Sequence, residues 1–266
     1  MLTPFRKKRS SRQKNARRIL EEQNVTLPDA DLSFLFQRDG CRTLRMTVRA
    51  DGSVRVKAPA SIPWENVLAF VRSRLDWVRE KRAFFAEHRG VPAPAREGST
   101  ALYLGRAFTL RPVPARRNAR AHFLGNTLEL PCLHPGLDDE ARDRAVERAF
   151  LRWRLEAAGL MLGRRLTRLD EHVRKTLGDS AAAHSLTVRS LKRRWGSCSV
   201  RGDITLAAQL VEMPLPLIDY VICHELCHLR AMNHGPAFHA LLRTLLPDAG
   251  EREKLIRIWG LEHPRT

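Results

Sequence analysis

The amino-acid sequence predicts an α+β fold, in which a mostly antiparallel β region precedes a largely helical second half. Three observations lead to this prediction. Residues 44–59 alternate apolar and polar side chains on both sides of Asp51-Gly52, which is typical of a β-hairpin. Residues 101–132 contain further short strand patterns, with turn signals at Gly105 and Gly125. From residue 138 onwards, long segments carry apolar residues at helical spacing.

Three regions are expected along the chain. Residues 1–25 read as a basic, disordered arm, because residues 1–20 hold eight Lys or Arg and no acidic residue. Residues 30–133 read as a mostly β region with one long helix, which begins after Pro63 and ends at Gly90. Residues 134–266 read as the second domain.

The second domain is expected to contain three helices and two strands. Acidic residues at the start of residues 138–175 and arginines at its end favour one long helix. Strands are expected at 186–191 and 204–210, on either side of a turn. Prolines then open two further helices, the first carrying the sequence HELCHLRAMNH (224–234) and the second stopping at Pro247.

Composition indicates a soluble protein of the cytoplasm. The chain of 266 residues fits one domain or two small ones. No apolar run approaches the roughly 20 residues of a membrane span, and the N-terminus has no apolar core of a secretion signal. The five cysteines are odd in number and lack the spacing of a disulfide scaffold.

The formal net charge of +18 is the strongest signal in the composition. Such a charge favours polyanionic partners, with nucleic acid the first candidate. The alternative is solvated positive charge without a dedicated partner. It stays open, because no aromatic-interleaved binding motif accompanies the charge along the sequence.

The stretch HELCH predicts a metal site. Residues four apart lie on the same face of a helix, so His224 and His228 can each bring a ring nitrogen to one zinc ion at about 2.0–2.1 Å. Glu225 lies one step round the helix and is suited to take a proton from water, which is the H-E-x-x-H metalloprotease arrangement. Cys223 and Cys227 point about 100° away and are expected to be small buried hydrophobes.

His234 is the candidate third ligand. Six residues separate it from His228, so the chain must leave the helix and turn back. Asn233 and Gly235 offer left-handed backbone geometry for that turn. Other residues nearby are weaker candidates: His239 and the start-of-helix residues Asp219 and Tyr220, which are expected to pack or face solvent, and Glu251 and Glu253, which are an alternative source of a carboxylate ligand.

The segment from about residue 185 to 245 closely resembles the YgjP-type (DUF45) metal-dependent hydrolases, which are grouped with the SprT/WLM-like zincins. The resemblance rests on these residues of the chain: Arg194-Trp195-Gly196-Ser197-Cys198, Ile218-Asp219-Tyr220, His224-Glu225-Leu226, His228-Leu229, Asn233-His234, Pro236 and Phe238. His239 departs from it, since an aromatic residue is expected there.

The resemblance implies a zincin-like α+β metallopeptidase domain over residues 134–266, with one catalytic zinc. It implies that His224, His228 and His234 bind the zinc and that Glu225 is the catalytic base. The segment Trp195–Cys198 would lie near the cleft between the sheet and the metal helix, with Gly196 allowing close approach.

The resulting functional prediction is a zinc-dependent hydrolase, a metallopeptidase acting on a protein or peptide substrate. Recruitment to nucleic acid by the basic arm and surface is a refinement of this prediction. Two alternatives stay open: a basic nucleic-acid-binding protein with a non-catalytic zinc site, and a hydrolase of non-peptide amides. The oligomeric state is not predicted.

Overall fold

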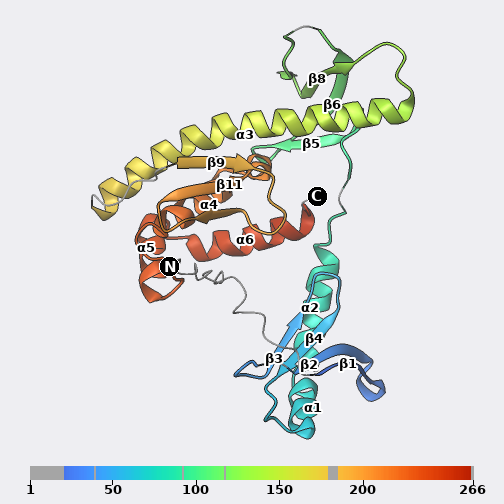
Figure 1. The fold of residues 1–266 in the computed structure, drawn as a ribbon, viewed down its shortest axis with the longest axis vertical. Coiled ribbons are helices and arrows are strands. Elements are labelled where there is room, and N and C mark those ends of the chain that lie inside the picture. Colours follow the sequence, from blue (N-terminus) through green and yellow to red (C-terminus); the bar gives the residue numbers. More distant parts are fainter. Residues whose placement is uncertain (1–20, 39, 92, 117, 179–184, 265–266) are drawn as a thin grey trace, which may run out of the picture. The chain divides into compact units, whose positions relative to one another are not determined.

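The computed structural model describes residues 21–38, 40–91, 93–116, 118–178 and 185–264 of the chain. The chain divides into two compact units, Met1–Arg89 and Gly90–Thr266. Across the described residues there are six α-helices and three sheets, which confirms the α+β class (Figure 1). Within the same residues, no helix combines the length and the apolar character that a membrane crossing demands. Residues 1–20 of the predicted arm lie outside the described residues.

The first unit contains a four-stranded sheet in the order β1-β2-β4-β3. β2 and β4 pair in parallel and the other two pairs are antiparallel. The predicted hairpin is confirmed, because β3 and β4 pair antiparallel around Gly52, whose φ is +80°. The bounds are β1 Glu21–Leu27, a 3₁₀ turn Pro28–Ala30, β2 Leu32–Arg38, β3 Arg45–Val48 and β4 Val54–Ala58. The segment 21–25, which we expected to belong to the arm, is therefore part of β1.

The single long helix expected in this unit is two helices, α1 (Trp64–Arg72) and α2 (Leu75–Glu87). The break lies at Ser73, whose hydroxyl donates a hydrogen bond to the carbonyl of Phe70 at 2.9 Å. Side-chain bonds of this kind compete with the helical ladder. Arg74 then leaves helical geometry, with φ −115° and ψ 9°. The apolar periodicity continues across the break, which is why the sequence pattern did not reveal it.

The second unit begins with a four-stranded sheet in the order β5-β6-β8-β7. Its strands are β5 Thr100–Tyr103, β6 Arg106–Pro114, β7 His122–Leu124 and β8 Thr127–Leu133. We expected these strands to share a region with the N-terminal hairpin. Instead, Leu110, Leu128 and Leu130 form one buried cluster with Val146 and Phe150 of the following helix. This shared core places the boundary between the units at Gly90 rather than near residue 133.

That following helix, α3, spans Asp139–Leu177 and confirms the long helix predicted at 138–175. Asp138 caps it by accepting a hydrogen bond from the backbone of Ala141 at 2.7 Å. Acidic residues occupy its first turn and basic residues its last, as the helix dipole favours. With 39 residues it is about 58 Å long, and it runs along the second unit beside the remaining elements (Figure 1).

A three-stranded sheet in the order β10-β11-β9 and three helices complete the second unit. β11 leads into a 3₁₀ turn rather than the longer strand expected at 204–210, and the last helix was not predicted. The bounds are β9 Ser185–Arg189, β10 Gly196–Cys198, β11 Asp203–Ala207, the 3₁₀ turn Ala208–Glu212, α4 Leu215–Cys227, α5 Pro236–Leu245 and α6 Ala249–Glu262. One buried core joins α3, β11 and α4 to α5 and α6.

Candidate metal centre

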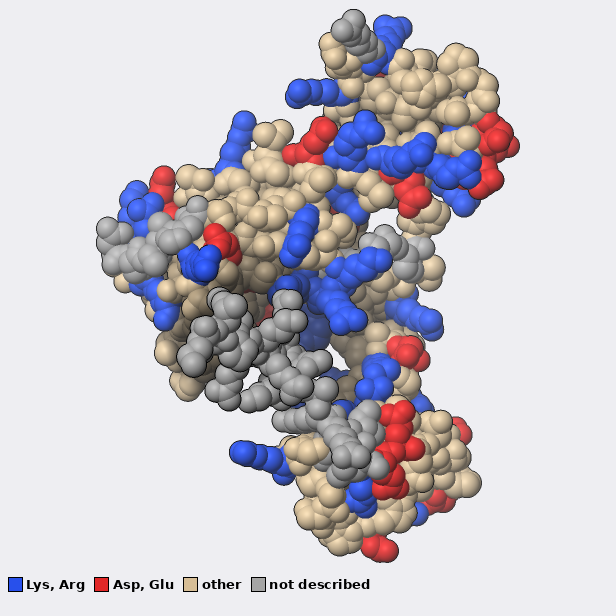
Figure 2. All heavy atoms as spheres, viewed as in Figure 1, with Lys and Arg blue, Asp and Glu red and all other residues tan. Residues whose placement is uncertain are grey.

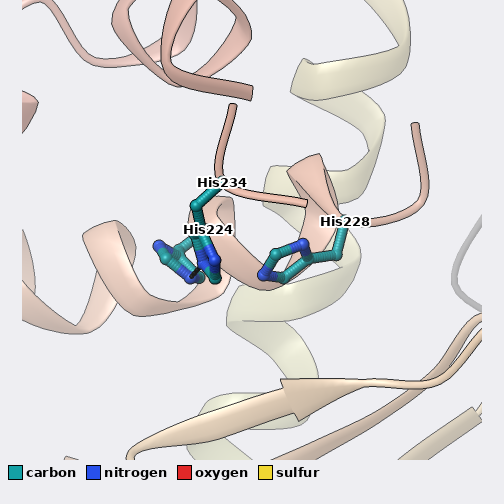
Figure 3. Close-up of side chains that lie close together, drawn as sticks. All are labelled: His224, His228 and His234. Atoms are coloured by element: carbon teal, nitrogen blue, oxygen red, sulfur yellow. Dashed lines mark hydrogen bonds between the residues drawn. The ribbon is translucent and has the colours of Figure 1, made fainter. Parts of the chain in front are cut away.

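Three histidine side chains converge at the end of α4. His224 lies in the last turn of α4, His228 is its C-terminal cap, and His234 lies on the loop before α5. Their ring centroids are 4.7–5.0 Å apart, and one nitrogen of each ring lies within 4.8 Å of the others (Figure 3). The Nε2 atoms of His224 and His234 are 3.0 Å apart. The three residues that the sequence singled out as ligands are therefore brought together.

The loop that returns His234 to the helix does not use the geometry we expected. Neither Asn233 nor Gly235 has a positive φ, and Gly235 is extended with φ −84°. The helix instead tightens at its end, where the backbone N–H groups of Leu229 and Ala231 donate to the carbonyls of Leu226 and Cys227. The expectation of a left-handed turn was wrong, because hydrogen-bonded turns at the helix end redirect the chain.

Two of the histidines are held in the neutral form that a metal requires. Burial lowers the pKa of His224 to about 4 and also lowers the pKa of His228. The Nδ1 atom of His228 lies 3.1 Å from the carbonyl oxygen of Ala231. A carbonyl can only accept, so Nδ1 carries the hydrogen and Nε2 keeps its lone pair for the cluster.

Phe238 packs against all three imidazole rings. It lies in the first turns of α5 and is fully buried. Its ring centroid is 4.8 Å from that of His224 and 4.7 Å from those of His228 and His234. We did not predict this role. The sequence alone held no sign of it, because His234 lies on the loop before α5 and the spacing of four residues is not a helical one.

Glu225 is buried between α4 and β10, with 5% of its surface exposed. A Cβ atom at Gly196 would lie 2.6 Å from Glu225 Oε1 and 2.8 Å from its Cγ, so only glycine fits at that position. The backbone of Cys198 donates a hydrogen bond to the carboxylate. Burial raises the pKa of Glu225 to about 7, against the opposing effect of the Arg194 charge. The close approach expected at Gly196 is therefore made to Glu225.

The cysteines beside the histidines are buried core residues, as expected. Cys223 and Cys227 are almost fully covered, and burial raises the pKa of their thiols to about 12 and about 11. The candidate ligand group among the described residues contains the three histidines alone.

The remaining candidates lie outside the cluster or pack at its edge. Asp219 forms a two-pronged ion pair with Arg165 of α3, which is a structural role. His239 contacts the edge of the Phe238 ring, with centroids 5.6 Å apart. Tyr220 lies one turn before His224, with ring centroids 6.0 Å apart. Glu253 pairs with Arg257 on its own helix.

The helix, the three histidines and the adjacent buried glutamate are the features of a metallopeptidase-type domain. The family profile described as "YgjP-like, metallopeptidase domain" matches residues 42–257, and the chain belongs to this family. Membership implies a metal ion. Among solved structures, the chain is similar to the metallopeptidase zymogen of Pyrococcus abyssi abylysin, with 26% identity and a TM-score of 0.33, covering 38% of this chain and 99% of that one. No curated protein matches the chain.

The residues present fit such an ion. His224 and His228 are neutral, and the three rings place nitrogen atoms within reach of one another. Two ligands of a tetrahedral ion at about 2.0–2.1 Å stand roughly 3.3 Å apart, close to the 3.0 Å between the Nε2 atoms of His224 and His234. Phe238 packs against all three rings and supports them.

Proposed function

We propose that this protein is a zinc-dependent peptidase, in which His224, His228 and His234 hold the ion and Glu225 is the catalytic base. The observation that carries the proposal is the convergence of three imidazoles beside a buried carboxylate. Three nitrogen ligands with no thiolate or carboxylate suit zinc and leave one position open. When bound, zinc supplies Lewis acidity toward a carbonyl oxygen and toward water.

Glu225 carries the proton in this proposal. Its carboxylate accepts a proton from the attacking water and delivers it to the amine that leaves when the peptide bond breaks. The packing of Gly196 and the hydrogen bond from Cys198 hold the carboxylate in place. A raised pKa makes the carboxyl group a better proton carrier near neutral pH.

The substrate backbone would lie along β10. In the sheet order β10-β11-β9, β10 is an edge strand over the described residues, and it contacts α4 beside Glu225. An extended peptide can add to such an edge through main-chain hydrogen bonds. This pairing suits a protein or peptide substrate and gives no reason to select a non-peptide amide.

The test is to measure zinc stoichiometry and hydrolysis of a peptide library for the wild type and for Glu225→Gln. We expect both to bind one zinc and the variant to lose activity by about 100-fold or more. Glu251→Gln is the matched control, because Glu251 is exposed on α6, and it should keep full activity. Equal zinc binding with no activity in either chain would favour the alternative, a non-catalytic zinc site.

The same proposal includes recruitment to nucleic acid, which the net charge of +18 supports. Basic side chains lie over both units on the face drawn in Figure 2, so the charge by itself does not single out one surface. The part assigned to the arm is tested by deleting residues 1–20. An unchanged salt dependence of DNA affinity would overturn that part and leave the peptidase proposal intact.

A further inference from the structure

Three hollows lie next to one another along α3 in the second unit. Two hollows of about 560 and 510 Å³ share Arg120, Trp153 and Leu160, and a third of about 430 Å³ shares Arg168 with the first. Shared walls make them one surface, which we call the α3 groove. It is lined along its length by Arg120, Arg152, Trp153, Arg164, Arg168 and Lys175.

Three basic side chains of the α3 groove, Arg164, Arg168 and Lys175, follow one face of the helix. Arg164 and Arg168 are four residues apart, so they lie one turn apart on the same face, whereas Arg152, twelve residues before Arg164, lies about 120° round the helix. Lys175 continues the row at the far end. From Arg164 to Lys175 the helix rises by about 16 Å, which is long enough to follow a few units of an extended polymer.

The positive charges that line the α3 groove are available to a ligand. Arg120, Arg152, Arg164 and Arg168 are exposed, and none has an ion pair with a carboxylate among the described residues. Arg165, by contrast, is turned to Asp219 and belongs to the structure of the unit. The acidic residues that line the groove are Glu156 and Glu171, so its charge is positive.

Aromatic rings stand in the same groove. Tyr103 of β5, Phe123 of β7 and Trp153 of α3 form a cluster, with ring centroids 5.5–5.7 Å apart. Phe123 keeps 38% of its surface exposed although it lies on the groove wall. The sequence showed no aromatic-interleaved basic motif because these rings come from three distant segments that the fold brings together.

We propose that the α3 groove binds single-stranded nucleic acid. Arginines without carboxylate partners contact the phosphates, and an exposed aromatic face stacks on an unpaired base. A duplex keeps its bases stacked on each other and an acidic peptide has no flat ring to stack, so both ligands leave Phe123 unused. This combination of a basic row and a ring platform selects the single strand.

The groove is separate from the metal centre. Leu215, the first residue of α4, lines the groove, and His224, the first histidine of the cluster, lies nine residues later, about 14 Å along the helix. The proposal deepens the recruitment part of the proposed function by assigning it a folded site, and it requires neither peptidase activity nor the arm.

The test measures fluorescence anisotropy of a labelled 12-nucleotide oligo-dT with the full-length chain. We expect the double variant Arg164→Glu/Arg168→Glu to weaken binding at least tenfold. The slope of log affinity against log salt should become shallower by about 1.4, or roughly 0.7 for each phosphate that an arginine no longer neutralises. The matched control is Arg243→Glu/Lys254→Glu, which removes the same charge from exposed positions on α5 and α6 and should change binding less than threefold.

The aromatic part is tested by Phe123→Ala, which should weaken oligo-dT binding at least fivefold, while Phe123→Trp restores it. Equal losses in the groove pair and the control pair would overturn the proposal, because the field of the whole surface would then explain binding. Tighter binding of a 12-base-pair duplex or of poly-glutamate than of oligo-dT would also overturn it. Deletion of residues 1–20 distinguishes the arm from the α3 groove. If the deletion abolishes oligo-dT binding and the groove variants do not change it, the groove proposal is refuted while the proposed peptidase function is untouched.

Discussion

Gly196 and Glu225 are in such close contact that a single methyl group cannot be placed between them. A Cβ at position 196 would lie 2.6 Å from Glu225 Oε1. The atoms it would meet belong to a buried side chain in the last turn of α4, so they cannot move aside easily. β10 therefore sets the position of the proposed base.

The first prediction is that Gly196→Ala lowers kcat/KM by about 10-fold to 100-fold while zinc stoichiometry stays at one. The added methyl displaces the Glu225 carboxylate from its place, and small displacements of a reacting group cost activity on this scale. Kinetics on a peptide substrate and metal analysis of the same sample provide the measurement.

The control for this variant is Gly163→Ala in α3, where an added Cβ approaches nothing closer than a Leu186 methyl at 3.9 Å. That change should raise the free energy of unfolding by about 0.5–1 kcal/mol, since alanine favours a helix interior, and leave activity as it is. If Gly196→Ala keeps wild-type kcat/KM, Glu225 is not positioned by β10.

A second prediction concerns Phe238, which supports the three imidazoles. Phe238→Leu should weaken zinc affinity by about 10-fold to 100-fold, a typical effect of losing the packing and bonds around metal ligands. Competition with a chromogenic chelator measures the affinity. Phe150→Leu is the matched control, because it removes a buried ring from the other core of the unit and should lower stability without changing zinc affinity. Equal zinc affinities for the two variants would contradict the supporting role.

Removal of the metal supplies a third prediction. The ion is held by the folded chain, so zinc at 100 times its Kd should add about 2.7 kcal/mol to the free energy of unfolding. For a unit of this size, that gain raises Tm by about 5–10 °C. Thermal unfolding of chelator-treated and zinc-loaded protein checks this, with His234→Ala as the chain that should respond weakly. A wild-type Tm indifferent to zinc would argue against the three-histidine site.

The fourth prediction separates structure from catalysis at Asp219. Asp219→Asn removes the charge that Arg165 pairs with, and leaving that partly buried guanidinium unpaired should cost about 2 kcal/mol of stability. Urea unfolding measures the loss. Activity per folded molecule should stay within twofold of the wild type; a large fall in kcat with normal stability would restore the alternative that Asp219 orients the substrate.

Local patterns predicted those parts of the molecule that depend on neighbouring residues. The hairpin at Gly52 follows from turn chemistry and the long helix from the charges at its two ends, and both are confirmed. The spacing of His224 and His228 places two ligands on one helical face for the same reason.

The unpredicted parts depend on tertiary packing. Periodicity cannot tell which sheet the face of α3 will cover. The sequence therefore placed the boundary near residue 133, whereas the two compact units meet at Gly90. The contact of Gly196 with Glu225 and that of Phe238 with the imidazoles join separate elements. Sequence alone shows that glycine and phenylalanine are present, whereas the fold decides what they touch.

The three proposed ligands all lie within the eleven residues from His224 to His234, whereas the glycine that fits against the base lies twenty-nine residues before it. Closing the shorter loop costs less chain entropy, while bringing β10 to α4 closes a longer one and accompanies the pairing of β10 with β11. Metal capture can therefore precede the formation of a working active site during folding. Under the proposed function, a newly made chain binds its ion before it can hydrolyse a substrate, and activity appears only when β10 docks.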